Sequence, residues 1–327
     1  MIVVTGGAGF IGSNIVRGLN ARGLDNILVV DDLSDGDKVR NIESCEIEEY
    51  MDKDEFLERV NKGADFGGPS AIYHQGACSD TMETNGRYIM ETNYEYSKSL
   101  FRYCREHNVA FIYASSASVY GAGDTFRESP DHEQALNAYA YSKLLFDRYV
   151  RKHRDLSQSQ VVGLRYFNVY GKGEEHKGRM ASVAYHFFNQ YHEQGYVNLF
   201  AGSGGYADGE QLRDFVWVGD VVDVNLHFLE HPEGRGIFNV GTGSAQSFND
   251  VATAVLNTLE GQNKTTAQWV ADGKIKYIAF PDALVGKYQS YTQADLTELT
   301  MTGDYKKNFA SVEEGVKTYI EQLQAAR

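Results

Sequence analysis

Cysteine, proline and basic residues are all scarce in this chain of 327 residues. Its three cysteines, Cys45, Cys78 and Cys104, include no Cys-x-x-Cys pair, and their odd number argues against a disulfide framework. Only four prolines occur, with no internal repeat and no low-complexity linker, so we expect the parts to pack as one body. The 31 Lys and Arg against 45 Asp and Glu give a formal charge of −14, which argues against a nucleic-acid partner, because such a partner requires a basic surface.

Long apolar runs are missing as well. No stretch approaches the roughly 18 continuous apolar residues that a membrane span needs, and residues 1–4 run directly into a glycine turn, unlike a secretory signal. Hydrophobic residues make up 42% and aromatic residues 13%, which is enough to bury a core. We therefore expect a cytoplasmic globular protein without a membrane partner, with about two domains or one large α/β domain and an appended part.

Short apolar runs alternate with helical stretches through the first half of the chain. The expected strands are 2–5, 27–30, 71–74, 110–114 and 161–164, and the expected helices are 11–22, 53–62, 87–107 and 139–153. Continuous apolar strands separated by helices are typical of a doubly wound parallel sheet, so the predicted fold class is a Rossmann α/β fold.

Beyond residue 170 the alternation loosens, and glycine and charge collect at 171–178 and 202–209. Strands at 214–218 and 236–240 and helices at 220–231 and 247–259 are still expected. We predict a second, smaller α/β substrate domain from about 168–213 plus 241–327. The dinucleotide-binding domain then comprises 1–167 plus about 214–240.

A glycine-rich turn follows the first expected strand. Gly6, Gly9 and Gly12 fit the phosphate-binding pattern, which needs a tight turn, close backbone approach to a pyrophosphate, and close helix–strand packing. The N-terminus of the next helix favours the phosphate charge. Asp31, 19 residues after Gly12, ends the second strand, where a ribose contact is expected.

The charges around Asp31 leave the cofactor's phosphate undecided. The Asp31 carboxylate repels a 2′-phosphate and favours NAD, whereas Lys38 and Arg40 lie just beyond and can neutralise that phosphate in NADP.

Tyr139 and Lys143 stand one helical turn apart, after an expected strand that ends near Ser116. A nearby cation stabilises a phenolate, so we expect Lys143 to lower the pKa of Tyr139. The phenol can then exchange a proton with a substrate hydroxyl while hydride passes to a nicotinamide. Tyr94 and Lys98 have the same spacing by chance, but no serine strand precedes them, so we interpret them as surface or packing residues.

Residues 5–12, Ser116 and Tyr139-x-x-x-Lys143 together resemble the extended short-chain dehydrogenase/reductase family. Residues 75–79 are similar to a cofactor-contacting turn of that family. Segments similar to its nucleotide-sugar epimerases are 165–171, 176–183, 213–216 and 288–295, so the resemblance spans nearly the whole chain. It implies one tightly bound NADP per subunit, with NAD possible, a nucleotide-sugar substrate, and a homo-oligomer, a pentamer by analogy.

The resemblance also implies the site residues. Tyr139 and Lys177 serve as the two acid/base groups, Ser116 polarises the reacting oxygen, and Lys143 holds the nicotinamide ribose and tunes Tyr139. The implied cofactor-binding residues are Gly6, Gly9, Phe10, Ile11, Gly12, Asp31, Asp32, Lys38, Lys53, Gln75, Gly76, Ala77, Cys78, Ser79, Thr92, Tyr139, Lys143, Val169 and Lys177. The implied substrate-binding residues are Ser116, Asn168, Arg179, His186, Phe200, Ala201, Gly202, Ser203, Arg213 and Tyr288.

Several positions depart from the family pattern. Thr92 stands where an Asn is common, Gln75 replaces an acidic residue, Lys172 replaces a Pro, and Arg179 replaces a small polar residue. Residues 204–212 form a longer stretch than usual. These departures concern the fine contacts to substrate rather than the chemistry.

Other functions are possible for a chain with these motifs besides that of an epimerase. A 4,6-dehydratase of this family has an Asp-Glu pair after its active-site Ser or Thr, whereas Ala117 and Ser118 follow here. A non-catalytic dinucleotide sensor typically loses the Tyr or Lys that this chain keeps. Lys177 can instead pair with a substrate phosphate.

Two further patterns concern charged side chains. A diphosphate in a chain of charge −14 must meet local cations, and Arg213 is the first candidate. The other cations considered are expected on loops of the second region, and they are Arg165, Lys172, Lys177 and Arg179. His227-x-x-Glu230-His231 matches a metal-binding spacing but has no evident third ligand, so we expect no metal.

Overall fold

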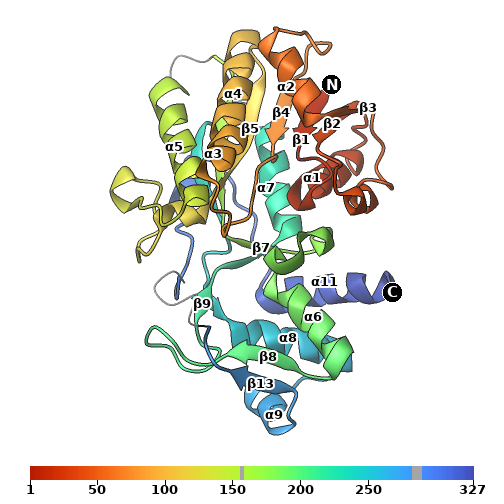
Figure 1. Cartoon of the computed structure of the whole chain (residues 1–327), viewed down its shortest axis with the longest axis vertical. Coiled ribbons are helices and arrows are strands. Elements are labelled where there is room, and N and C mark those ends of the chain that lie inside the picture. The colour runs from red at the N-terminus through yellow and green to blue at the C-terminus, as the bar shows by residue number, and fades with distance from the viewer. Residues whose placement is uncertain (155–157, 282–288) are drawn as a thin grey trace. The chain divides into compact units, whose positions relative to one another are not determined.

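The computed structural model describes residues 1–154, 158–281 and 289–327 (Figure 1). The chain divides into two compact units. The first contains residues 1–166, 221–240 and 296–306, and the second contains 167–220, 241–295 and 307–327. These limits differ from the expected ones at three places, because 167 and 214–220 lie in the second unit and 296–306 in the first. No helix in the described ranges is both long enough and apolar enough to cross a membrane.

The first unit contains a seven-stranded sheet in the order β11-β6-β5-β4-β1-β2-β3, with every strand pair parallel. Its strands are β1 (Ile2–Thr5), β2 (Ile27–Asp31), β3 (Glu49–Asp52), β4 (Ala71–His74), β5 (Ala110–Ser116), β6 (Val161–Tyr166) and β11 (Gly236–Val240). This topology confirms the predicted doubly wound α/β fold. The strand order reverses between β1 and β4, so their carboxyl ends form the switch point where such sheets bind ligands.

Helices cover both faces of this sheet (Figure 1). Their bounds are α1 (Phe10–Asn20), α2 (Lys53–Asn61), α4 (Tyr96–His107), α5 (Ala138–His153) and α7 (Val218–Glu230), which starts in the second unit. Shorter helices are η1 (Gly36–Asn41), α3 (Gly86–Ile89), η3 (Ala117–Tyr120), η4 (Pro130–His132) and α10 (Thr297–Met301). Helices α2, α4 and α5 pack on one face, and α1 with the 221–230 part of α7 packs on the other.

The apolar strands supply the core of the first unit. Val3 pairs with both Leu28 and Ile72, and Ile72 pairs with Phe111, so one row of side chains crosses four strands. All four are at most 1% exposed, and Phe101 of α4 packs edge-on against Phe111. Burial of each such side chain contributes about 1.5–3 kcal/mol.

The predicted single helix over 87–107 is interrupted. It consists of α3, a π-helical turn η2 (Met90–Glu95) and α4, and Asn108 caps the end of α4 in the left-handed conformation (φ 57°). The extra residue of the π-turn brings Asn93 into the core at 1% exposure, with its amide available for the contacts described below.

Among its described residues, the second unit has three two-stranded sheets and five helices. Its strands are β7 (Asn168–Tyr170), β8 (Val197–Phe200), β9 (Leu212–Arg213), β10 (Phe215–Trp217), β12 (Gln246–Ser247) and β13 (Ile275–Ile278). Its helices are η6 (Glu175–Met180), α6 (Val183–Gln194), α8 (Phe248–Glu260), α9 (Thr266–Ala271) and α11 (Val312–Ala325). Helix α8 packs against α6 and α11, and Ser247 and Ser311 start α8 and α11 with capping boxes.

Asp214 ties three segments of the second unit together. Its fully buried carboxylate accepts hydrogen bonds from the backbone N–H groups of Thr242, Gly243 and Ala294, at 2.6–2.9 Å, and from the Thr242 hydroxyl. The strand that carries Arg213 is therefore fixed to two loops that are distant in sequence.

Candidate active site

The glycine turn folds onto its own backbone at the carboxyl end of β1. A Cβ at Gly12 would lie 2.1 Å from the Gly6 carbonyl oxygen, and one at Gly9 would lie 3.1 Å from it. Gly6 itself has a φ of +65°, and a Cβ there would lie 2.6 Å from the Gly76 nitrogen. The turns after β1 and β4 thus meet backbone to backbone, and the first turn of α1, with Phe10 and Ile11, opens directly behind them. This cradle fits the pyrophosphate of a dinucleotide.

Basic side chains surround the carboxylates at the end of β2. Asp31 accepts hydrogen bonds from the Ala8 N–H at 2.8 Å and from Lys38 Nζ at 2.5 Å. Lys53 lies 3.8 Å from the Asp32 carboxylate. Two lysines therefore offset the negative charge at the position expected for the adenosine ribose.

A buried hydrogen-bond chain starts at this cradle. The Thr5 hydroxyl lies 2.7 Å from Nδ1 of His74, and Nε2 of His74 lies 2.8 Å from the Ser97 hydroxyl, which donates to the Asn93 carbonyl. Because the Ser97 proton is used, Nε2 must donate and Nδ1 must accept, so one neutral tautomer is fixed. Burial lowers the pKa of His74 to about 3, which keeps it neutral.

Asn93 continues this chain toward helix α5. Its amide accepts from the Cys78 N–H at 2.8 Å and donates to the Cys78 carbonyl at 3.0 Å, which holds the turn after β4. It also donates to Ser142, whose hydroxyl bonds the Tyr139 carbonyl. Gln75 of the same turn accepts from the Tyr166 hydroxyl, and Thr92 is half-buried beside Asn93 in the π-turn.

Ser116, Tyr139 and Lys143 come together at the carboxyl end of β5. Ser116 ends the strand, Tyr139 and Lys143 lie one turn apart near the start of α5, and Tyr139 is hydrogen-bonded to Ser116. The Lys143 ammonium donates to the Ala114 carbonyl at 2.8 Å. The serine and the phenol can therefore share one substrate oxygen.

The expected effect of Lys143 on Tyr139 is wrong. Burial raises the pKa of Tyr139, and the hydrogen bond with Ser116 is what opposes that rise. Lys143 is 5% exposed and turns its ammonium to Ala114, and burial lowers the pKa of Lys143 to about 8.

The competing motifs in the first unit are structural. Lys98 lies 4.4 Å from the centre of the Tyr94 ring and pairs with Glu95, so this second Tyr-x-x-x-Lys spacing packs on α4. His227 and His231 stack at 3.9 Å, and His227 Nε2 lies 2.8 Å from the Gly303 carbonyl. Within the described ranges, no three His, Cys, Asp or Glu side chains form a group that could hold a metal.

Lys177 lies in η6 of the second unit, where Gly178 kinks the chain with φ 52°. Its side chain is half-buried, and burial lowers its pKa while the charge of Glu174 opposes the shift. Glu174 is fully buried and accepts from the Gly171 and Ser182 N–H groups and from the Ser182 hydroxyl. This carboxylate closes the loop that presents Lys177.

The remaining predicted residues of the second unit lie on several elements. Asn168 and Val169 are in β7, Arg179 is exposed in η6, His186 is in α6, Phe200 ends β8, and residues 201–203 follow it. Arg213 in β9 is 5% exposed and lies 6.0 Å from the Phe248 ring centre. Tyr288 lies outside the described residues. Arg165 is not a loop cation, because it is fully buried in β6 of the first unit.

With this geometry in place, comparison with known proteins identifies the class. The chain matches the NAD dependent epimerase/dehydratase family over residues 2–241 and belongs to it. It is 57% identical over 325 residues to an ADP-L-glycero-D-manno-heptose-6-epimerase from Thiobacillus denitrificans, covering 98% of both chains.

Two solved structures of the same class are also similar. An ADP-L-glycero-D-manno-heptose-6-epimerase from Helicobacter pylori shares 30% identity with a TM-score of 0.82, over 99% of this chain and 96% of that one. A UDP-glucose 4-epimerase from Thermus thermophilus, in complex with NAD, shares 28% identity with a TM-score of 0.77, over 100% and 99%.

Sequence reasoning missed the residues that position the predicted site residues without belonging to the motifs. Asn93, Asp147 and Glu174 contact the loops, strand and helix that carry the predicted residues. Asp147 had one available signal, since it stands four residues after Lys143 on the same face of α5. Glu174 and Asn93 had none, because their partners come from other segments.

Proposed function

We propose that this protein is an ADP-glycero-manno-heptose 6-epimerase, which interconverts the D-glycero and L-glycero forms of the nucleotide sugar. The observation that carries the proposal is the 57% identity to such an enzyme along 98% of both chains. The joined Ser116, Tyr139 and Lys143 in the first unit supply the residues that this chemistry needs.

The chemistry follows from the substrate. Carbon 6 of the heptose bears an unactivated C–H bond, so a base cannot invert it directly. A bound nicotinamide would supply reversible hydride transfer at this carbon, so that the hydride could return to the opposite face. Loss and return of one proton at the 6-hydroxyl complete the balance.

Each residue has a distinct part in this proposal. Tyr139 takes the proton from the 6-hydroxyl in one orientation of the sugar, and Ser116 donates a hydrogen bond to the same oxygen. Lys143 holds the nicotinamide ribose. Lys177 serves the other orientation, and burial lowers its pKa, which favours the exchange of a proton. Arg213 meets the diphosphate.

We propose NADP as the bound form of the cofactor. Lys38 on Asp31 and Lys53 beside Asp32 offset the carboxylates that would otherwise repel a 2′-phosphate. From the family resemblance of the sequence, we also propose a cytoplasmic homo-oligomer that supplies heptose for the lipopolysaccharide core.

The test is turnover with a matched tyrosine pair. Purified protein incubated with ADP-D-glycero-D-manno-heptose should give the L-glycero epimer by NMR, and the cofactor released on denaturation should be NADP. Tyr139→Phe should lower the rate about 10²-fold or more, whereas Tyr94→Phe should leave it nearly intact. Equal rates in the two variants would show that Tyr139 is not the group that exchanges the proton. Loss of water from the sugar would indicate a dehydratase, and absence of any conversion would indicate a sensor.

A further inference from the structure

We propose that Asp147 is a positioning residue of the active site, which fixes the Ser116 strand against helix α5 and maintains the charge of Lys143. The inference rests on the proposed function only for its activity readout.

The carboxylate of Asp147 joins α5 to β5 immediately before Ser116. Oδ1 accepts from the Tyr113 hydroxyl and Oδ2 from the Ser115 hydroxyl, each at 2.9 Å. Lys143, one turn earlier on α5, bonds the Ala114 carbonyl at 2.8 Å. Three successive residues of β5 are thus bonded to two successive turns of α5, and the position of Ser116 relative to Tyr139 follows from these bonds.

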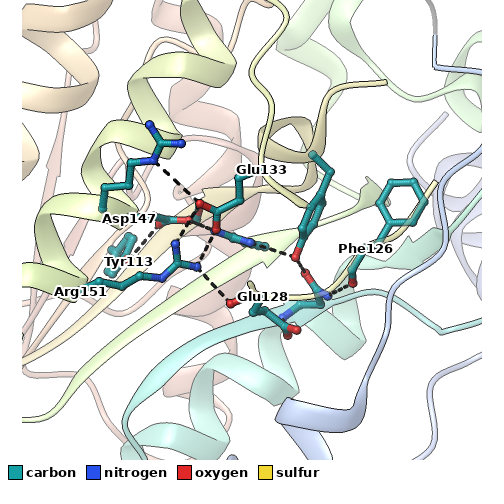
Figure 2. Close-up of polar contacts among 11 residues, drawn as sticks. Tyr113, Phe126, Glu128, Glu133, Asp147 and Arg151 are labelled. Carbon is teal, nitrogen blue, oxygen red and sulfur yellow. Dashed lines mark hydrogen bonds and ion pairs between the residues drawn. The ribbon is translucent and has the colours of Figure 1, made fainter. Parts of the chain in front are cut away.

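The far side of Asp147 is bonded to a buried guanidinium. Arg165 Nε donates to Asp147 Oδ2 at 2.9 Å, and Arg165 Nη2 donates to Glu133 at 2.5 Å. Glu133 also pairs with Arg151 at 2.6 Å and with Arg148 at 4.0 Å, so this group holds two carboxylates and three guanidiniums (Figure 2). Because Asp147 and Arg165 are fully buried, their charges act through a medium that screens them weakly.

The groups that face Lys143 come from α5 and from the region of β4. They are Asp147 and Tyr139 on α5, and His74 and Cys78 from β4 and its turn. Burial raises the pKa values of Tyr139 and of the Cys78 thiol and lowers that of His74 to about 3, so these three are neutral near pH 7. Of these four groups, Asp147 is the one that is charged near pH 7. Its attraction opposes the effect of burial on the pKa of Lys143, and Cys78 adds a smaller attraction where its thiol ionises.

The position of Asp147 suits this role. Its oxygens accept from Tyr113, Ser115 and Arg165, which leaves the Lys143 ammonium bonded to Ala114. The carboxylate thus acts on Lys143 by its field from one turn away, and it does not draw the ammonium away from the nicotinamide ribose that Lys143 is proposed to hold.

The test separates charge from hydrogen bonding. Asp147→Asn removes the charge in nearly the same volume, Asp147→Glu retains it, and Ser115→Ala removes one hydrogen bond and no charge. In Asp147→Asn, the alkaline limb of the kcat/KM profile should move down by at least about one pH unit, a tenfold loss of proton affinity at Lys143. In Asp147→Glu, which keeps the charge, the alkaline limb should lie close to its wild-type position. Ser115→Ala should lower kcat several-fold but leave the position of the alkaline limb unchanged.

A second readout needs no heptose. The contribution of Lys143 to stability is measured by comparing each protein with its Lys143→Met counterpart in urea, across pH. The pH at which this contribution changes should also fall by about one unit in Asp147→Asn. If this midpoint pH is unchanged in Asp147→Asn, the inference is overturned, whether or not the wild-type protein epimerises ADP-heptose. If the midpoint pH shifts but the wild-type protein does not epimerise ADP-heptose, only the proposed function is overturned.

A milder variant covers the case in which Asp147→Asn does not fold. Tyr113→Phe removes a donor from the carboxylate and so strengthens its field at Lys143, which should move the same midpoint upward by a few tenths of a pH unit. An unchanged or lower midpoint in this variant overturns the inference.

Discussion

Replacing Lys143 by Met should stabilise the protein near pH 7 while abolishing turnover. Lys143 is 5% exposed, and burial lowers its pKa from 10.5 to about 8. The folded state therefore holds a protonated amine at a free-energy cost that methionine does not carry. The stabilised but inactive variant would show that the site trades stability for function.

The size of this stabilisation follows from the pKa values of Lys143 in the unfolded and folded states. The fall from 10.5 to about 8 corresponds to about 3 kcal/mol. Methionine also leaves the Ala114 carbonyl without its donor, which costs about 1 kcal/mol. The net gain near pH 7 is then about 2 kcal/mol.

The difference in stability between Lys143→Met and the unmodified protein changes sign with pH. Between about 8 and 10.5 the unfolded state binds more protons at Lys143 than the folded state does, so the stability of the unmodified protein rises with pH in this window. The Lys143→Met variant lacks this rise, so its advantage should disappear and then reverse as the pH approaches 10.5.

Urea unfolding of cofactor-stripped protein at a series of pH values measures the difference. Lys62→Met is the control, because the Lys62 side chain, just after the end of α2, is 71% exposed. A Lys143→Met variant that is less stable near pH 7, or a difference that does not vary with pH, would refute the reasoning. A slope of equal size in the control would show that burial is not its cause.

Three further outcomes are expected. Gly9→Val should lose bound cofactor, because the valine side chain obstructs the approach of the pyrophosphate. Gly86→Ala should retain the cofactor, because a Cβ there meets nothing within 4 Å. Equal cofactor content in the two variants would show that the glycine turn does not bind the pyrophosphate. Lys177→Met should still bind ADP-heptose but epimerise it about 10²-fold more slowly; weak binding with a normal maximal rate would make Lys177 a phosphate contact. Asp214→Asn should lower the free energy of unfolding by about 2–3 kcal/mol, because its amide nitrogen cannot accept the N–H donors that converge there; a loss below about 0.5 kcal/mol would contradict this.

The parallel sheet was largely predictable because its strands carry the signal locally. Residues 2–5, 71–74 and 236–240 were predicted to the residue, and β5 and β6 extend two residues further than expected. Strand β3 was missed because it lies at the sheet edge, and only Met51 of its four residues is buried. An edge strand lacks the continuous apolar run that marks its neighbours.

The candidate site was only partly predictable, for a physical reason. Motif spacing locates Tyr139 and Lys143 because both lie on one helix. The charges that act on them come from elsewhere: Arg165 is 18 residues beyond Asp147, and Glu133 belongs to a loop 32 residues before Arg165. Likewise, no local propensity predicts the π-turn at Met90–Glu95, which brings Asn93 to the Cys78 turn.

The discontinuity of the first unit has a consequence for folding during synthesis. Strand β11 completes the sheet beside β6, yet it is made 70 residues after β6 ends, counted from Tyr166 to Gly236. Until β11 leaves the ribosome, β6 is an edge strand in which every residue of the finished protein is buried. Such an edge invites pairing with other chains, so a nascent or truncated chain ending before Val240 should depend on chaperones and should aggregate when they are withheld.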